Sequence, residues 1–204
     1  DTYASADDFM YCMENSPTSN SGAADYGNTT GVVYQWKATV SGSDGNAGAN
    51  CFYAYNGEYY ATLAALVQDY PDVLSVTGGA ADATALGTEL KTAYDNTSSR
   101  EEGISSFRAK YKIKVYTEGI MYYTYFIQDQ NYVKDDNNHY YAVMRNTIYD
   151  LTVTKLARIG TDIPGGWNPD VDPEDPVDPT NVYMVVQATV NPWVVSREDD
   201  ITLD

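Results

Sequence analysis

Histidine is almost absent from this 204-residue chain, with His139 as its single example, and cysteine is limited to Cys12 and Cys51. A catalytic triad or a zinc site built on histidines is therefore nearly excluded. The two cysteines permit one disulfide, and two buried free thiols are the alternative. The sequence gives no distance between the two residues, so both alternatives stay open.

Basic residues are also scarce, with 12 Lys and Arg against 29 Asp and Glu and a formal net charge of -17. This balance argues against nucleic acid and against an anionic membrane surface as partners, because both require basic patches. No apolar run approaches the roughly 20 residues that a membrane-crossing helix needs. The chain starts at Asp1 without a Met, which favours a processed piece of a longer exported precursor.

Motifs for chemistry are missing too: the sequence has no phosphate-binding loop, no nucleophile elbow and no CxxC pair. Asp170, Asp172 and Glu174 alternate as in a calcium loop, but the Gly and Glu that such a loop needs are replaced by Asp175 and Asn181. We therefore predict no catalytic residue, no cofactor and no metal site.

Tyrosine is abundant, with 20 residues, and 43% of the chain is hydrophobic. Tyrosine favours strands and half-exposed sheet faces, so the composition suits a packed β protein of a secreted or surface kind. We predict a mainly β fold, an antiparallel β-sandwich with Greek-key-like connections of the transthyretin or immunoglobulin-like type. Short helices form an insert at about 60–108, and the chain ends in an extended strand.

Strand patterns occupy both ends of the predicted core. A short apolar patch at 9–13, the run 32–40 and the run 51–55 come first, and Asn56-Gly57 is a hairpin-turn signal. Runs at 111–115 and 120–128 are expected to pair through a turn near Glu118-Gly119. The expected strands 140–145 and 147–156 complete the list, and the second alternates strictly, which implies one buried and one wet face.

The middle of the chain has helical periodicity. Apolar residues spaced three and four apart predict a helix that Pro71 ends, a second helix in which Gly87 is a weak point, and a third behind a capping box of Ser98 and Glu101. The apolar faces consist of Leu63, Leu66, Val67 and Tyr70 in the first helix, Ala83, Leu86, Leu90 and Tyr94 in the second, and Ile104 and Phe107 in the third.

The chain divides into three predicted parts: a core at 1–160, an acidic proline-rich linker at 161–180 and a C-terminal segment at 181–204. Prolines and repelling carboxylates favour an extended linker. One face of the strand after it, and the tail that follows Pro192, are apolar. The predicted subunit-contact residues are Val182, Met184, Val186, Ala188 and Val190 on the strand and Trp193, Val195, Ile201 and Leu203 in the tail. The segment can complete its own sheet or add a strand to a neighbouring molecule.

A family resemblance rests on residues 140–153, Tyr-Tyr-Ala-Val-Met-Arg-Asn-Thr-Ile-Tyr-Asp-Leu-Thr-Val. They are similar to a segment of Bacteroidales fimbrillins in which Arg-Asn-x-x-Tyr is set among hydrophobic positions. The linker, the strand after it and Asn191-Pro192-Trp193 fit the same pattern, as does Cys12-Met13-Glu14-Asn15 before 29–33. The chain resembles the C-terminal domain of a fimbrillin of the Mfa1 type, a major subunit of type V pili.

The resemblance implies a structural subunit of a cell-surface fimbrium, exported through the outer membrane as a lipoprotein precursor. An arginine-specific protease removes the first strand of such subunits, and the C-terminal strand of one subunit fills the groove of the next. The implied partners are identical or homologous fimbrial subunits in a head-to-tail polymer, and a host or bacterial surface receptor. Shaft, anchor and tip roles stay open, although an exchangeable C-terminal strand favours the shaft.

The alternative function is a monomeric carbohydrate-binding or adhesion module. Its candidate residues are aromatic side chains able to stack on sugar rings, and the other interpretation is that they form strand core and rim. The residues are Trp36, Tyr122, Tyr123, Tyr125, Phe126 and Trp167.

Overall fold

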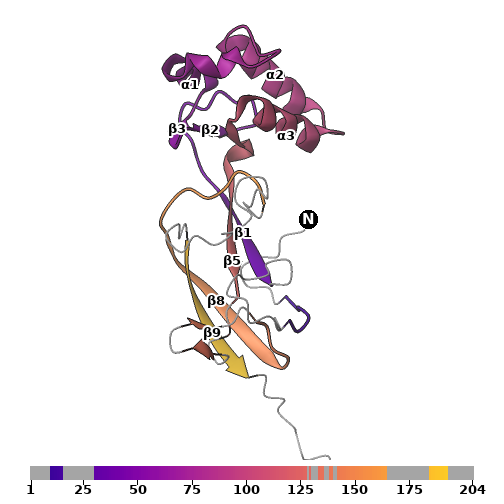
Figure 1. The fold of residues 1–204 in the computed structure, drawn as a ribbon, viewed down its shortest axis with the longest axis vertical. Helices are drawn as coiled ribbons and strands as arrows, with labels where there is room; N and C mark the ends of the chain where they lie inside the picture. Colours follow the sequence, from indigo (N-terminus) through magenta and orange to yellow (C-terminus); the bar gives the residue numbers. More distant parts are fainter. Residues whose placement is uncertain are drawn as a thin grey trace, which may run out of the picture. The chain divides into compact units, whose positions relative to one another are not determined.

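The computed structural model describes residues 10–15, 30–127, 129, 133–135, 138–139, 142–164 and 184–192. The fold is mainly β with several antiparallel sheets, which is compatible with the predicted β-sandwich, and it contains a group of short helices. The chain forms two compact units. We call Asp1–Val33, Thr124–Ile159 and Trp167–Asp204 the ribbon unit, and Tyr34–Tyr123 with Gly160–Gly166 the helical unit. Figure 1 labels their elements.

A three-stranded sheet in the helical unit has β2 (Phe52–Tyr55) at its centre, between β3 (Glu58–Tyr60) and β4 (Lys114–Tyr116). The β2–β3 hairpin confirms the Asn56-Gly57 turn: Asn56 has a φ of 54° and Gly57 a φ of 85°. Two successive positive φ values are what a tight two-residue hairpin turn requires, so local turn chemistry set this register.

Three α-helices and a short 3-10 helix share one hydrophobic core with Tyr53 and Val115 of this sheet. They are α1 (Leu63–Asp69), η2 (Pro71–Ser75), α2 (Ala83–Asp95) and α3 (Arg100–Tyr111). Their core positions confirm the predicted helix faces, since Leu63, Leu66, Leu86, Leu90, Ile104 and Phe107 are all at most 3% exposed. Thr62 and Asp82 cap α1 and α2 by accepting the Ala65 and Ala85 N–H groups.

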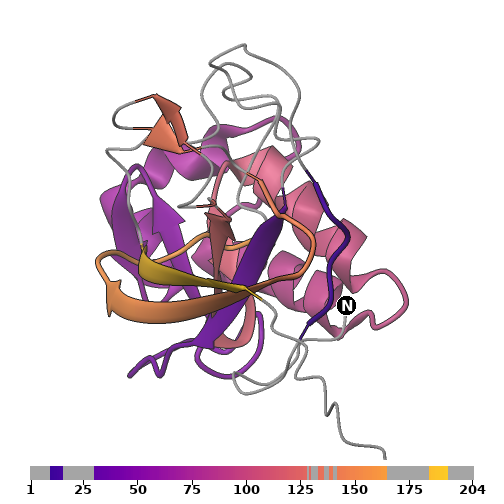
Figure 2. The same ribbon diagram turned by 90° about the horizontal axis from the view of Figure 1, so that it is seen from below.

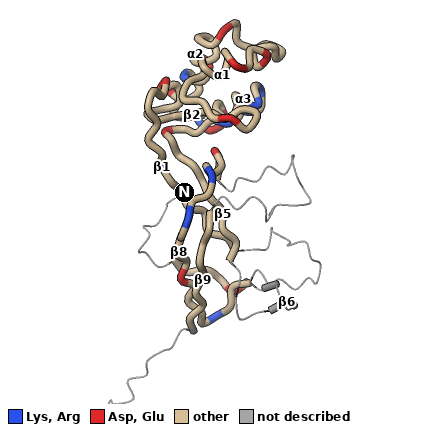
Figure 3. The backbone as a smooth tube through the Cα atoms, turned by 90° about the vertical axis from the view of Figure 1, so that its left-hand side faces the viewer, with Lys and Arg blue, Asp and Glu red and all other residues tan. Residues whose placement is uncertain are grey.

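The start of α3 differs from its prediction. The N-cap is Ser99, one residue later than expected, and its side chain makes no capping hydrogen bond. Its ψ of 28° is outside the extended region that aims a cap hydroxyl at the helix N–H groups. The helix dipole is stabilised by acidic residues in the first turn, Glu101 and Glu102, and by basic residues in the last turn, Arg108 and Lys110. Figure 3 colours these charged residues red and blue.

The expected hairpin between strands 111–115 and 120–128 is wrong. Helix α3 continues to Tyr111, so β4 starts only at Lys114, and β4 pairs with β2. A 3-10 turn, η3 (Thr117–Gly119), separates it from β5 (Ile120–Phe126), which pairs with β1 (Gly31–Lys37). The hydrogen bonds from Ala38 N–H to Gly119 and from Ile127 N–H to Thr30 make that pair antiparallel.

The ribbon unit contains β6 (Val133–Asp135), β7 (Asn138–His139), β8 (Thr147–Leu156) and β9 (Met184–Pro192). The expected first strand is not formed at Met10–Met13. Of the expected strand 140–145, the structure describes residues 142–145, where Val143 forms an isolated bridge with Asn15. Met10, Tyr11 and Met13 are 66–87% exposed, so this apolar patch does not pack as a core strand would.

Candidate functional site

The predicted C-terminal strand forms one side of a two-stranded ribbon. β9 pairs antiparallel with β8 at nine positions, from Thr147 opposite Pro192 to Leu156 opposite Met184. Figures 1 and 2 both show the two strands side by side. In the part of the chain that the structure describes, this sheet has no third strand.

The alternation predicts one buried and one wet face for β8, and in the ribbon the apolar face is half-buried. Tyr149, Leu151 and Val153 lie opposite Val190, Ala188 and Val186, and all six side chains are half-buried. On the other face, the pairs Asp150–Thr189 and Thr152–Gln187 are exposed. Cross-strand apolar pairs of this kind hold a ribbon together, yet half-burial leaves part of their surface in water.

A β-bulge interrupts the ladder after Val153, because Val153 pairs with Val186 while Lys155 pairs with Val185. Thr154, the extra residue, donates its hydroxyl to the Val185 carbonyl at 3.2 Å. Beyond the bulge, Met184 is only 8% exposed, whereas its partner Leu156 is 40% exposed. We call the apolar face of the ribbon its inner face. Four of the nine predicted contact residues, Met184, Val186, Ala188 and Val190, lie on the inner face of β9. Val182, Trp193, Val195, Ile201 and Leu203 lie outside the described residues.

The Arg-Asn-x-x-Tyr motif forms the turn that leads into β8. Asn146 has a φ of 56°, a left-handed conformation that Asn tolerates better than most residues. Tyr149 reaches back, so that its hydroxyl accepts the Met144 N–H at 2.9 Å and donates to the Asp129 carboxylate at 2.8 Å. Asp129 is 2% exposed. Burial, and then the hydrogen bond to Asp129, raise the pKa of Tyr149 to about 12.

The segment 10–15 attaches to the same turn. Asn15 and Val143 exchange two backbone hydrogen bonds of 2.8 and 2.7 Å, and Arg145 pairs with Glu14 at 3.0 Å. The Arg145 side chain is 76% exposed, so this ion pair contributes little to stability. The motif therefore acts through its tyrosine and its turn more than through its arginine.

Both cysteines are free thiols in the structure, so the disulfide that the sequence permits is not formed. Cys12 is exposed. Cys51 is fully buried in the helical unit, where its sulfur lies 3.4 Å from the Tyr53 hydroxyl and from an Asp44 carboxylate oxygen. Burial raises the pKa of Tyr53 strongly.

The aromatic residues of β5 lie mostly within the fold: Tyr123 is 4% exposed, and Tyr122, Tyr125 and Phe126 are half-buried. Trp36 on β1 is 40% exposed, and Trp167 lies outside the described residues. This distribution favours strand core and rim over a sugar-stacking platform.

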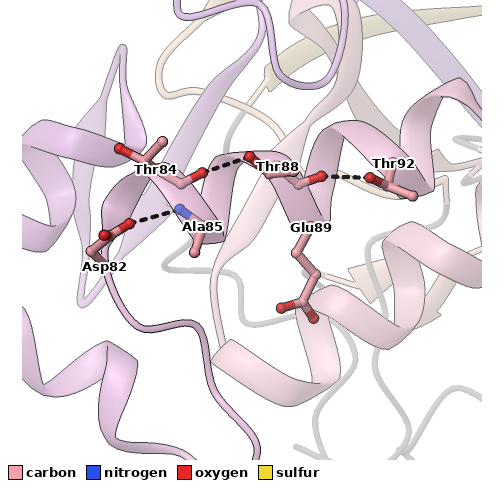
Figure 4. A pocket seen from close by; sticks show the side chains of 6 residues that line it. All are labelled: Asp82, Thr84, Ala85, Thr88, Glu89 and Thr92. Carbon is pink, nitrogen blue, oxygen red and sulfur yellow. Dashed lines mark hydrogen bonds between the residues drawn. The ribbon is translucent and has the colours of Figure 1, made fainter.

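A surface hollow of about 660 Å³ lies along α2 (Figure 4). Two of its three lining threonine hydroxyls are used within the helix, because Thr88 donates to the Thr84 carbonyl and Thr92 to the Thr88 carbonyl. Among the described residues, no group of three His, Cys, Asp or Glu side chains could hold a metal. Within the same residues, no helix has the length and apolar character needed to cross a bilayer.

Residues 114–199 match the family described as the major fimbrial subunit protein type IV, fimbrillin, C-terminal. The match supports a fimbrillin-family domain in this chain. It spans β4 to β9 and therefore contains the whole ribbon and the Tyr149 turn. It also supports a fimbrial subunit role at a surface fimbrium, alongside other fimbrial subunits, in a family of structural subunits. Comparison with curated proteins finds no match.

Proposed function

We propose that this chain is part of the shaft subunit of a bacterial fimbrium, of the Mfa1 type found in Bacteroidales, and that it polymerises by donor-strand exchange. The segment 181–204 leaves its own ribbon and adds to the sheet of a neighbouring subunit. The subunit reaches the cell surface as a lipoprotein precursor, and the filament supports adhesion to a host or bacterial surface. The observation that carries the proposal is the incomplete burial of the β8–β9 ribbon.

β9 is suited to strand exchange because it is hydrogen-bonded on one edge. β9 contacts a single strand, β8, in the described part of the chain. When β9 leaves β8, one ladder of hydrogen bonds breaks. Main-chain hydrogen bonds to a neighbour's strand can replace that ladder, since backbone pairing does not depend on side-chain identity.

The half-buried inner face supplies the driving force. Val186 and Val190 keep part of their surface in water within the subunit. Fully burying a valine side chain stabilises by about 1.5–3 kcal/mol, so completing the burial of each in a neighbour's groove contributes about 1 kcal/mol. A strand donated head-to-tail generates an open filament, because a heterologous contact does not close on itself.

The first test is electron microscopy of the protease-matured full-length protein with and without residues 181–204. We expect filaments only when the segment is present. Filaments in both cases would show that β9 belongs to its own sheet and that assembly uses another surface.

A matched pair of variants sharpens this test. Val186→Asp places a charge on the inner face opposite Val153, and Gln187→Asp places the same charge on the exposed face opposite Thr152. We expect Val186→Asp to abolish filaments and Gln187→Asp to leave them intact. Equal behaviour of the two variants would contradict insertion of the inner face into a groove.

A further inference from the structure

The chain between β8 and β9 is fastened to the helical unit at its beginning. Thr161 and Tyr122 exchange two backbone hydrogen bonds of 2.9 Å each, and the Thr161 hydroxyl donates to the Ile163 carbonyl at 2.9 Å. The Tyr116 hydroxyl donates to the Gly160 carbonyl at 2.9 Å. We call Gly160–Ile163 the anchor.

Asp162 is the charged residue of the anchor, and its side chain is 8% exposed. One of its carboxylate oxygens lies 2.7 Å from Arg108 Nε and accepts the Val115 N–H at 3.0 Å. Arg108 Nη2 donates to the carbonyls of Val115 and Asp162 at 2.6 and 3.1 Å. The ion pair thus ties the end of α3, the start of β4 and the anchor together, and charged groups this enclosed are costly to separate.

Close packing holds the first anchor residue as well. Gly160 is buried, and a Cβ atom at this position would collide with the Tyr122 carbonyl and meet the Tyr123 ring at 3.0 Å. Only glycine permits this approach of two backbones. The anchor contacts described above all join residues of the helical unit.

The position of the anchor in the chain gives it a consequence for strand exchange. β8 ends at Leu156, four residues before Gly160, and β9 begins at Met184, twenty residues after Pro164. Once β9 has left β8, a pull transmitted along the chain from β9 reaches the anchor before it reaches β8. Twenty residues span at most about 65–70 Å when extended, so the anchor also limits how far the donated strand can reach.

We propose that Gly160–Ile163 is a fixed anchor from which the exchangeable C-terminal segment extends, and that it stays bound to Arg108, Val115 and Tyr122 when β9 is donated. This inference rests on the proposed donor-strand function. The anchor defines the moving part as the residues after it, so its residues set the point from which the donated strand extends.

Two engineered disulfides in the full-length chain test this inference, both in a Cys12→Ser background that removes the exposed native thiol. The anchor lock combines Tyr122→Cys with Thr161→Cys, residues that pair directly. The ribbon lock combines Thr152→Cys with Gln187→Cys, which are directly opposed on the exposed face of β8 and β9. Directly opposed residues on paired strands are close enough for a disulfide. Each variant is compared with its own reduced form.

We expect the oxidised anchor lock to form filaments at the same rate as its reduced form, and the oxidised ribbon lock to form none. Filaments from the reduced but not the oxidised anchor lock would overturn the anchor while leaving donor-strand exchange intact. Filaments from the oxidised ribbon lock would overturn the exchange itself.

Amide hydrogen exchange of the unmodified chain gives a second readout that does not depend on the lock variants folding. The Tyr122 and Thr161 amides should exchange within threefold of the same rate in subunits and in filaments. Exchange more than tenfold faster in filaments would show that the anchor opens during assembly and would overturn the inference.

Discussion

Removal of one hydroxyl, in Tyr149→Phe, tests whether the motif turn stabilises the β8–β9 ribbon. The hydroxyl links the Met144 N–H to the carboxylate of Asp129, which is 2% exposed. A hydrogen bond to a charged group contributes about 1.5–3 kcal/mol, and the Met144 N–H also loses its acceptor. We expect a loss of about 2 kcal/mol in the free energy that opens the ribbon.

The change should be local, so the assay is native-state hydrogen exchange resolved by residue. At about 1.4 kcal/mol per factor of ten, a loss of about 2 kcal/mol makes the β8 amides exchange roughly 30 times faster. Amides of α2 and α3 should keep their rates. The matched control is Tyr55→Phe, since Tyr55 contacts the Tyr70 ring and phenylalanine preserves that contact. A change below about threefold in β8, or an equal change in the control, would refute the assigned role of the hydroxyl.

Two further predictions concern pH and helix packing. The folded-state pKa of Tyr149 is about 12, above its ordinary value of 10.0, so the stability that its hydroxyl contributes is complete below pH 10 and is lost as the pH rises through 12. The difference in amide exchange rate between wild type and Tyr149→Phe should therefore shrink between pH 10 and 12. A constant difference would contradict this prediction. Gly103→Ala should lower the free energy of unfolding in urea by about 1 kcal/mol although alanine favours helices, because the added Cβ would lie 2.9 Å from the Ala93 Cβ on α2. Adding Ala93→Gly should relieve that cost. Additive effects of the two changes would contradict the contact.

The sequence predicts elements best where their signal is local. The bounds of β8 are those expected for 147–156, because strict alternation of apolar and polar residues specifies a strand with two different faces. The Asn56-Gly57 hairpin and the three helix faces follow from turn chemistry and from the 3.6-residue period in the same way. Gly87, expected as a weak point, is instead a place of close approach to the Asn46 side chain, which no periodicity reveals.

Partner choice is where prediction from the sequence fails. Strands 111–115 and 120–128 are adjacent in the chain and were expected to pair, yet β4 pairs with β2 and β5 with β1. Backbone ladders have the same chemistry for any two strands, so pairing is set by how the helices and loops pack around them. The apolar patch Met10–Met13 fails as a strand for the same reason, since its composition allows one but no strand pairs with it among the described residues.

The sequence by itself determined that this chain is an acidic, mainly β protein with a helical insert and an apolar strand near its end, because composition and periodicity act over short distances. It also contained the Arg-Asn-x-x-Tyr segment. Only the tertiary structure decided that Tyr149 donates a hydrogen bond to the buried Asp129 and that β9 pairs with β8. It also decided that Asp162 forms an ion pair with Arg108, fifty-four residues earlier in the chain. Such contacts join residues far apart in sequence, and they form only when the packing of the whole unit repays the entropy of bringing them together.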